Sequence, residues 1–164
     1  FCKLISGYQQ PQSGNIYLRS EKLLKPSRSI LYIPQEDDLF EWHTLKQHFE
    51  FISKLKNTNA PNAYLLDILG LSNVLHQSPK QLSGGQKKKA QIYKSFLINP
   101  MLIVFDETFS AIDQSSTDLI ISEFLKIWKQ KETSVIFVSH YSQNIKPYVG
   151  RVLKMEKLSL RAEN

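Results

Sequence analysis

Two adjacent carboxylates, Asp106 and Glu107, directly follow the apolar run of residues 101–105. Such a run is typical of a central parallel strand buried on both faces, and ligands bind beyond the carboxyl ends of such strands. One carboxylate there can hold Mg²⁺ and the next can orient or deprotonate a water molecule, as nucleotide hydrolysis requires. A strand end capped by two solvated acids gives the same pattern, so this motif alone leaves both interpretations open.

A more specific motif is the glycine-rich segment Leu82, Ser83, Gly84, Gly85 and Gln86. Adjacent glycines let the backbone approach a ligand closely, and the helix predicted after them would turn its free N–H groups and positive dipole end toward a phosphate. Three lysines at 87–89 add positive charge to that first turn, which opposes the helix dipole unless an anion binds there. The alternative is a turn capped by Ser83, with the lysines on a solvated helix face.

The elements around these motifs predict an α/β fold. Residues 30–33 and 134–139 are short apolar runs rich in β-formers, and each is typical of a buried strand. Helical patterns cover residues 44–55, 63–69, 86–98 and 117–131. In the last of them the predicted apolar side consists of Leu119, Ile120, Phe124, Ile127 and Trp128. A strand, helix, strand, helix order in the second half indicates a parallel sheet, with helical material inserted in the middle.

The composition describes one folded domain. The chain has 164 residues, of which 41% are hydrophobic and 22% charged, which is outside the ranges of disordered and collagen-like chains. Its single cysteine, Cys2, can form no internal disulfide, so we expect a reducing compartment. The apolar runs are far shorter than the ~20 residues that a membrane-spanning helix needs. The net charge of +6 comes from lysines spread along the chain, and we expect no nucleic-acid partner.

In their order along the chain, these motifs resemble those of the nucleotide-binding domain of ABC transporters. Residues 82–86 match the family's signature motif, and Gln35 resembles its Q-loop glutamine. The Walker B pair is matched by Asp106 and Glu107, the D-loop by residues 110–113, and the switch histidine by His140. The resemblance implies a P-loop NTPase-like (RecA-like) α/β fold with a mostly parallel sheet and an inserted helical subdomain.

The same resemblance implies a domain organisation. We expect a single nucleotide-binding domain over residues 1–164, a helical subdomain with the signature motif over residues 36–95, and the part from Walker B to the switch histidine over residues 96–164. The family's Walker A loop precedes the helix expected over residues 2–6, so we expect an N-terminally truncated domain. Without a phosphate-cradling loop and its lysine, the chain by itself should be inactive as an ATPase.

Residue by residue, the resemblance implies a site for ATP and Mg²⁺. The catalytic residues would be Glu107, which polarises the attacking water, His140, which contacts the γ-phosphate, and Gln35, which senses the metal and that water. The metal would be held by Asp106 and Gln35. The ATP of a partner protomer would be bound by Leu82, Ser83, Gly84, Gly85, Gln86 and Asp113. A second nucleotide-binding domain, in a homodimer or heterodimer, is therefore an implied partner.

The function that the resemblance implies is ATP hydrolysis that powers solute transport, by a peripheral protein on the cytoplasmic face of a membrane. Transmembrane permease subunits are the other implied partners. Leu39, Phe40 and Trp42 lie where the family contacts its permease, and we expect them to form an exposed apolar patch. Phe109 matches a residue common in importer ATPases, which favours import.

Two departures from the family pattern and two other functions remain. Thr108 stands where the family usually has proline, and Lys89 where it usually has arginine, so a bidentate contact at Lys89 is lost. One alternative is a non-transport member of the superfamily, and the other is a degenerate cassette that binds without turnover. The chromosome-maintenance type is excluded, because residues 36–81 leave no room for its long coiled coil. The ribosome-acting type, with two cassettes in one chain, stays open.

Overall fold

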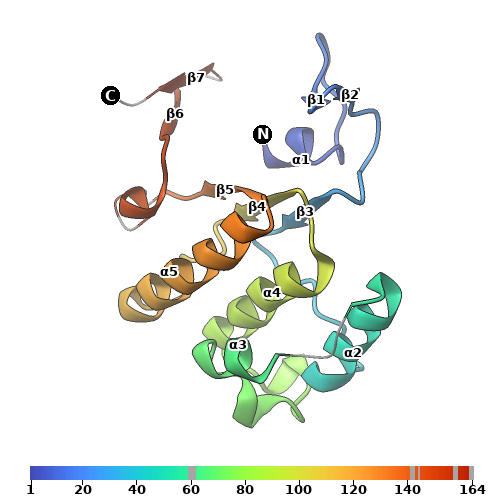
Figure 1. The fold of residues 1–164 in the computed structure, drawn as a ribbon, viewed down its shortest axis with the longest axis vertical. Helices are drawn as coiled ribbons and strands as arrows, with labels where there is room; N and C mark the ends of the chain where they lie inside the picture. Colours follow the sequence, from blue (N-terminus) through green and yellow to red (C-terminus); the bar gives the residue numbers. More distant parts are fainter. Residues whose placement is uncertain (59–61, 141–142, 144, 157–158, 163–164) are drawn as a thin grey trace.

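A three-stranded parallel sheet forms the centre of the chain (Figure 1). The structure is a computed structural model that describes residues 1–58, 62–140, 143, 145–156 and 159–162. The sheet has the order β3-β4-β5, with β3 at Ile30–Ile33, β4 at Leu102–Asp106 and β5 at Ser134–Val138. In β4 the three residues 103–105 are buried, so the predicted central parallel strand is confirmed.

β5 is less buried than its apolar sequence predicts. Its first residue is exposed and the other four are only partly buried. Among the described strands, β5 pairs with β4 on one edge and with no strand on the other. The prediction of a buried strand over residues 134–139 is therefore right about the strand and wrong about its burial.

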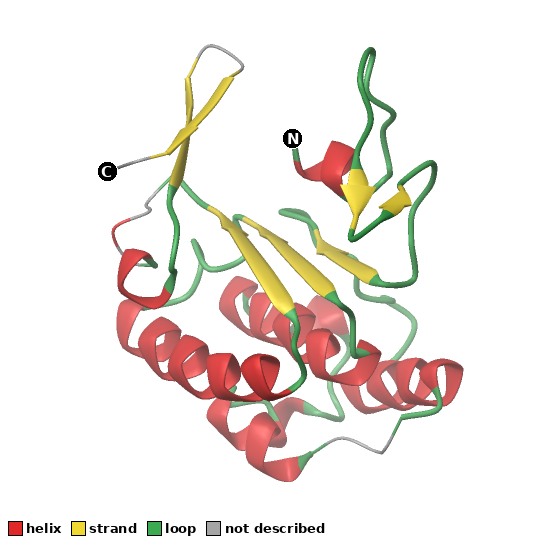
Figure 2. Cartoon of the chain, turned by 45° about the horizontal axis from the view of Figure 1, so that its top comes forward, coloured by secondary structure: helices red, strands yellow, loops and turns green. Residues whose placement is uncertain are grey.

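Helices fill the chain between β3 and β4. They are α2 (Leu45–Lys56), α3 (Ala63–Ile68), the short 3-10 helices η1 (Ser72–Val74) and η2 (Pro79–Gln81), and α4 (Gly84–Ile98). A further helix, α5 (Gln114–Gln130), connects β4 to β5. Figures 1 and 2 show α2, α4 and α5 on one side of the sheet. The inserted helices are thus present, while the bounds 36–95 of a helical subdomain stay a prediction.

Each longer helix begins at a residue whose side chain caps it. The capping residues are Thr44 for α2, Asn62 for α3, Ser83 for α4 and Asp113 for α5, and each accepts a hydrogen bond from a backbone N–H in the first turn. In α2 and α4 a glutamine three residues later completes a capping box. The starts of these helices are therefore fixed by local sequence.

Aromatic side chains from α4, α5 and β4 form the core beneath the sheet. Phe96 stacks on Trp128 with ring centroids 5.7 Å apart, and Phe105 lies 5.5 Å from the same indole. On α5 the buried positions are 117, 120, 121, 124 and 128, which follow one helical stripe. Leu119 lies off that stripe and is 49% exposed, so its assignment to the apolar side is wrong.

The other side of the sheet carries the two ends of the chain. There lie α1 (Cys2–Ile5), a hairpin of β1 (Tyr17–Leu18) and β2 (Glu21–Lys22), and a hairpin of β6 (Leu153–Glu156) and β7 (Ser159–Ala162) (Figure 1). The 3-10 helix η4 (Lys146–Tyr148) instead contacts α5, where the Tyr148 hydroxyl donates to Asp118 Oδ1 at 2.8 Å. The predicted end of the first helix at Gly7 is confirmed, because this glycine has a φ of +77° and packs against the backbone of Lys25. No helix of the described residues combines the length and the apolarity that a membrane span requires.

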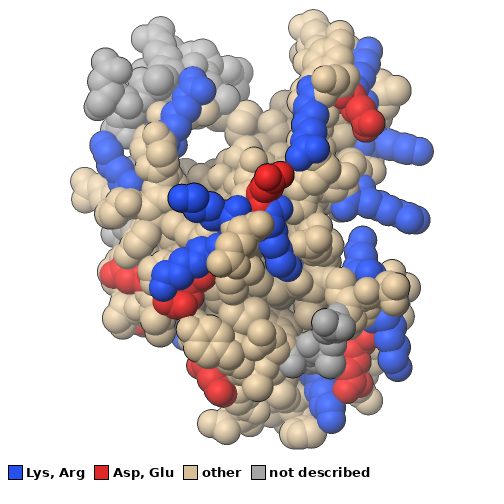
Figure 3. Space-filling view, in the orientation of Figure 1, with Lys and Arg blue, Asp and Glu red and all other residues tan. Residues whose placement is uncertain are grey.

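Basic side chains are distributed over the surface. Figure 3 shows lysines and arginines from the top to the bottom of one face, over several elements. This agrees with the spread of lysines along the sequence, and the expected lack of a nucleic-acid partner stays a prediction.

Candidate functional site

The carboxyl ends of β3, β4 and β5 open into a cleft of about 1300 Å³. Gln35, Asp106, Glu107 and His140 all line it, together with residues of α1, β5 and β6. Parallel pairing brings the ends of the strands to one edge of the sheet, so residues far apart in the sequence, such as Gln35 and Asp106, meet there. The structure therefore brings together the four residues for which the sequence predicts catalysis or metal binding.

Glu107 is held in an unusual backbone conformation directly after β4. Its φ is +53°, in the left-handed region that residues other than glycine seldom adopt. Its N–H donates to the Val138 carbonyl at 2.9 Å, and its own carbonyl accepts from the Ser110 hydroxyl at 2.7 Å. Because strain of this kind persists where the surroundings enforce it, the side chain has a fixed direction at the strand end.

The carboxylate of Glu107 meets His140 at the end of β5. Its Oε1 accepts the backbone N–H of His140 at 3.0 Å, and the imidazole Nε2 lies 3.5 Å from the same oxygen. The Glu107 side chain is 10% exposed, whereas the His140 side chain is 89% exposed. The carboxylate is thus anchored inside the cleft, and the imidazole beside it is open to a ligand.

Two groups that the sequence analysis did not select lie next to Asp106. The Tyr32 hydroxyl donates to its Oδ2 at 2.8 Å. Burial, and then the nearby Asp106 carboxylate, raise the pKa of the Cys2 thiol to about 11. Burial and the hydrogen bond to Asp106 also raise the pKa of Tyr32 well above its ordinary value. Tyr32 is therefore a site residue that sequence reasoning missed, and its place near the end of a neighbouring parallel strand is the signal that could have found it.

Oxygen donors at this edge suit Mg²⁺. The Asp106 carboxylate and the Gln35 amide line the same cleft, and such hard oxygen ligands are those that Mg²⁺ prefers. Within the described residues there is no group of three or more His, Cys, Asp or Glu side chains that could hold a metal. This is compatible with Mg²⁺, which usually takes one or two carboxylates and fills its shell with water and phosphate oxygens.

The glycine-rich segment lies apart from that cleft. Ser83 and Gly84 are exposed at the start of α4, and none of residues 82–86 lines the cleft. The Ser83 side chain accepts from the Gln86 N–H at 3.2 Å, while the Gln86 side chain accepts from the Ser83 N–H at 2.9 Å. Capping, the alternative weighed for Ser83, is therefore present, and it leaves the helix start open to solvent.

Asp113 lies close to this helix start. The loop before it touches α4, because a Cβ built on Gly85 would be 3.2 Å from the Ala111 carbonyl oxygen. The Asp113 carboxylate accepts from the Ser116 N–H at 2.8 Å and from the Ser115 hydroxyl at 2.7 Å. These bonds hold the pKa of Asp113 far below its usual range, so the group is an anion at neutral pH.

An aromatic surface follows Gln35 in the chain. It consists of Phe40, Trp42, His43 and Phe51, with Phe40 stacked on Trp42 at 5.4 Å and 5.8 Å from Phe51. Trp42 is 77% exposed. Leu39, by contrast, is buried in the core, so the predicted patch of Leu39, Phe40 and Trp42 is wrong in its first member.

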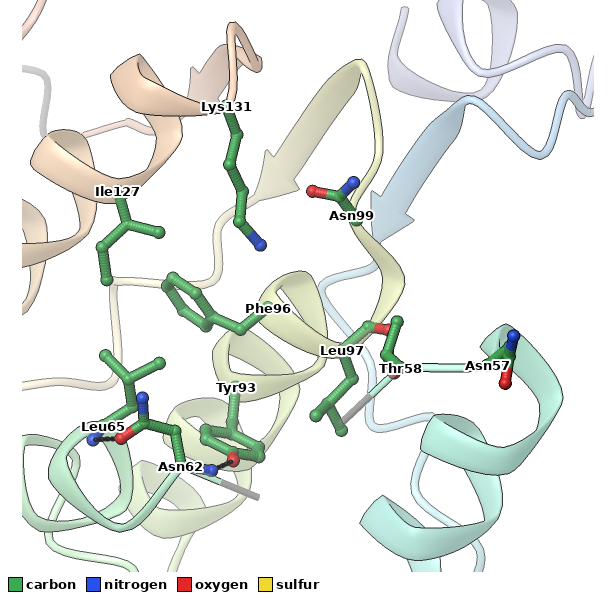
Figure 4. Close-up of a pocket in the computed structure, with 10 residues that line it drawn as sticks. All are labelled: Asn57, Thr58, Asn62, Leu65, Tyr93, Phe96, Leu97, Asn99, Ile127 and Lys131. Carbon is green, nitrogen blue, oxygen red and sulfur yellow. Dashed lines mark hydrogen bonds between the residues drawn. The ribbon is translucent and has the colours of Figure 1, made fainter. Parts of the chain in front are cut away.

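A second hollow carries none of the predicted site residues. Its volume is about 630 Å³, and Figure 4 shows Tyr93, Phe96 and Lys131 among the residues around it. The Tyr93 hydroxyl there accepts the Asn62 N–H at 2.7 Å, which joins the start of α3 to α4. Its hydrogen bonds thus hold helices together, and the chemistry-bearing groups lie in the larger cleft.

Several known proteins that resemble this chain are ATP-binding proteins of importers. It is 29% identical over 143 residues to the nitrate import ATP-binding protein NrtD of a Synechocystis species, covering 84% of this chain and 54% of that protein. It is 31% identical over 140 residues to the aliphatic sulfonates import ATP-binding protein SsuB of Bacillus cereus, covering 84% and 56%. The chain thus spans about half the length of these curated relatives.

Solved structures show the same fold. A dimeric ATP-binding cassette in a post-hydrolysis state, bound to ADP and Pi, superposes with a TM-score of 0.84 over 99% of this chain and 78% of that one. Sequence identity in that pair is 21%, so the likeness concerns the fold, and it confirms the predicted P-loop NTPase-like α/β class. A model of the ABC transporter family matches residues 1–110, well over half of the 164, and the chain therefore belongs to the ABC transporter family.

Proposed function

We propose that the full-length protein is the ATP-binding and ATP-hydrolysing subunit of an ABC transporter that imports a solute across a membrane. The observation that supports this most directly is the cleft in which Gln35, Asp106, Glu107 and His140 meet in a member of this family. Import is supported by the relatives, whose names describe nitrate and sulfonate import. The subunit would lie peripherally on the cytoplasmic face, bound to permease subunits.

In this proposal Glu107 acts on the attacking water. Its carboxylate is anchored by the His140 N–H and by a backbone conformation that fixes the direction of the side chain. A base held in this way keeps the correct geometry for accepting a proton from water at the end of β4. The exposed His140 imidazole would donate to a phosphate oxygen on which charge develops.

Asp106 and Gln35 would hold Mg²⁺. Tyr32 fixes the orientation of the Asp106 carboxylate, and Gln35 lines the same cleft from the end of β3. When bound, Mg²⁺ would neutralise phosphate charge and ATP would supply the γ-phosphoryl group. The protein groups thus provide positioning and electrostatic stabilisation, the two contributions on which phosphoryl transfer depends.

A second copy of the cassette would complete the site. Ser83, Gly84, Gly85 and Asp113 lie on an exposed surface, away from the cleft of their own chain. In this proposal these groups, with Leu82 and Gln86 on either side of the Ser83–Gly85 segment, bind a nucleotide that another protomer presents. We therefore propose a two-fold or pseudo-two-fold dimer that binds ATP between the cleft of one chain and the start of α4 in its partner.

The substitution Glu107→Gln in the full-length protein tests this function. We expect steady-state ATPase to fall at least about 100-fold, the lower range of a general-base contribution, while ATP-dependent dimerisation is kept. Phosphate release and size-exclusion chromatography with ATP measure the two properties. Hydrolysis by the variant at the parent rate would contradict the role of Glu107.

The parent protein and the isolated chain are the controls for that experiment. A full-length parent that binds ATP without hydrolysing it would favour a degenerate cassette over an ATPase. Residues 1–164 contain no glycine-rich phosphate loop with its lysine, so we propose that this chain alone is inactive. Robust turnover by the isolated chain would contradict that proposal.

A further inference from the structure

Side chains on one face of α4 form a hydrogen-bond network with residues 35–38. The Lys88 ammonium donates to the Gln35 carbonyl and, at 3.1 Å, to Gln91 Oε1. The Gln91 amide donates to the Glu36 carbonyl and to Asp38 Oδ1, both at 3.0 Å. A third α4 side chain, Lys94, donates to the same Asp38 oxygen.

These α4 side chains are far more buried than their polarity predicts. Gln91 is 0%, Lys94 5% and Lys88 9% exposed. Lys88 thus corrects the interpretation of residues 87–89 as a solvated helix face, because its ammonium lies under the chain it holds. Burying such groups is costly unless their hydrogen bonds are made, so the arrangement has few alternatives of similar energy.

Ion pairs strengthen this network between α4 and residues 35–38. Asp37 is paired with Lys87 at 3.2 Å and with Lys88 at 3.8 Å. Burial by itself raises the pKa of Asp38, but the facing Lys94 and the Gln91 amide outweigh it, so the pKa lies below its ordinary value. Asp38 is therefore an anion at neutral pH, held by a nearly buried cation.

Residues 35–38 and α4 each reach a different functional surface. Gln35 lines the cleft with Asp106 and Glu107, whereas the start of α4 at Ser83 faces outward. Because α4 is a continuous helix from Gly84 to Ile98, a shift of its inner face also shifts its first turn.

We propose that Lys88, Gln91 and Lys94 are positioning residues for Gln35, which lock the backbone of residues 35–38 to α4 so that Gln35 and the Ser83 end of that helix move as one unit. The proposal rests on the role of Gln35 in the function proposed above. Each protomer contacts its own nucleotide through Gln35 and its partner's nucleotide through the start of α4. The proposal links these two contacts mechanically, through side chains that touch neither nucleotide.

Limited proteolysis of the full-length protein without nucleotide tests whether the α4 network holds residues 35–38 in place. Gln91→Leu keeps a similar side-chain volume and removes the hydrogen bonds from the Gln91 amide to residues 36 and 38. Chymotrypsin cleavage after Leu39 and Phe40, mapped by mass spectrometry, should become about 10-fold faster, as the loss of buried hydrogen bonds raises the open population. Ser95→Ala is the matched control, because Ser95 is on the same helix, is 2% exposed and has no hydrogen-bond partner for its hydroxyl among the residues that the structure describes.

The outcomes of this first experiment are distinct. Unchanged cleavage in Gln91→Leu, with the thermal unfolding temperature also unchanged, would overturn the proposal. If Gln91→Leu fails to fold, Lys94→Met takes its place, and cleavage at the parent rate in that variant overturns the proposal equally.

A double-mutant cycle measured on the kcat of ATP hydrolysis tests whether the α4 network acts through Gln35. Gln91→Leu should lower kcat about 10-fold in the parent and less than about 2-fold in a Gln35→Ala background, because coupled residues are non-additive. Equal fold losses in both backgrounds would mean a merely structural role and overturn the positioning. If Gln35→Ala itself leaves kcat unchanged, the role proposed for Gln35 fails. The proteolysis result still decides whether the α4 network restrains residues 35–38.

Discussion

The hydroxyl of Tyr32 is the direct partner of Asp106, the carboxylate that follows β4's apolar residues. Tyr32 lies opposite Val104 in the parallel register, so its ring reaches the strand end from β3. One of the two Asp106 oxygens is thereby fixed before any ligand arrives. A carboxylate whose rotamer is fixed binds a cation without first losing that rotational freedom.

Replacing Tyr32 by phenylalanine should therefore weaken Mg²⁺ use more than it weakens catalysis. Loss of one hydrogen bond to a charged group corresponds to about 10-fold in the Mg²⁺ concentration that gives half-maximal ATPase, with kcat changed less. A Mg²⁺ titration of the full-length variant measures both values. Tyr17→Phe removes an exposed hydroxyl outside the cleft and should leave the titration unchanged. An unaltered midpoint in Tyr32→Phe would show that this hydroxyl does not prepare Asp106.

At the scale of elements, the sequence predicts most of what positions the site. The apolar runs predicted the three parallel strands. The helix starts were predicted less well: α4 begins at Gly84 and α5 at Gln114, not at 86 and 117, because Ser83 and Asp113 cap the first turns. What it could not give are tertiary partners: the burial of Lys88 under Gln35 and the hydrogen bond of Tyr32 depend on which elements meet. The one-sided pairing of β5 is equally a property of the sheet, because an apolar run looks the same at its edge and at its centre.

The caps of α2 and α4 separate local stability from function. Thr44 and Ser83 both form a capping box with a glutamine, so either change to alanine should destabilise the domain by about 1 kcal/mol. Only Ser83 lies in the segment proposed to meet the partner's nucleotide. Ser83→Ala should therefore lose ATP-dependent dimerisation in the full-length protein, while Thr44→Ala keeps it. Urea unfolding and size-exclusion chromatography measure the two effects, and equal dimerisation by both variants would count against the proposed surface.

His48 makes the packing of α2 sensitive to acid. It is 1% exposed, its Nδ1 accepts the Phe40 N–H at 3.5 Å, and its Nε2 has no hydrogen-bond partner among the described residues. Burial, and then the positive charge of Lys94, lower the pKa of His48 to about 4, although Asp38 partly opposes this shift. The folded state thus keeps His48 neutral over a range in which the unfolded chain binds a proton.

The free energy of unfolding should consequently fall as pH decreases from about 6.5 to about 4, because the unfolded state is the one that gains the proton. At about 1.4 kcal/mol per pKa unit, the loss from this group reaches up to about 3 kcal/mol. Urea unfolding of the parent and of His48→Gln across this range measures the difference, and the variant should have the shallower dependence. His76→Gln replaces an exposed histidine and should keep the parent's dependence. Parallel curves for the parent and His48→Gln would contradict the assignment.

For the whole molecule, three surfaces are tied to one helix. The cleft at the strand ends, the outward start of α4 and the aromatic surface of Phe40, Trp42, His43 and Phe51 all connect to α4 through residues 35–40 or directly. Asp38, held by Lys94, is only two residues from Phe40. A partner bound to the aromatic surface would therefore act on a segment that α4 already holds, which is the arrangement a transport ATPase needs if hydrolysis and permease movement are to be linked.

The final prediction concerns that aromatic surface and the permease proposed to bind it. Trp42 is 77% exposed and stacks on Phe40, whereas Phe40 also contacts the buried His48. Trp42→Ala should therefore remove partner contact at little cost in stability, and Phe40→Ala should cost stability as well. In the assembled transporter we expect Trp42→Ala to reduce substrate uptake several-fold, as for an interface anchor, while the ATPase of the separate subunit is unchanged.

Tyr17→Ala is the matched control, since it removes a 58% exposed aromatic ring from β1, on the opposite side of the sheet. Uptake in reconstituted vesicles and ATPase in solution are the two measurements. Full uptake by Trp42→Ala would show that the permease binds elsewhere, because a large exposed indole at a true interface cannot be removed without loss of buried apolar area. Loss of both uptake and solution ATPase would instead place Trp42 in the fold of the segment after Gln35, and not in a contact with a partner.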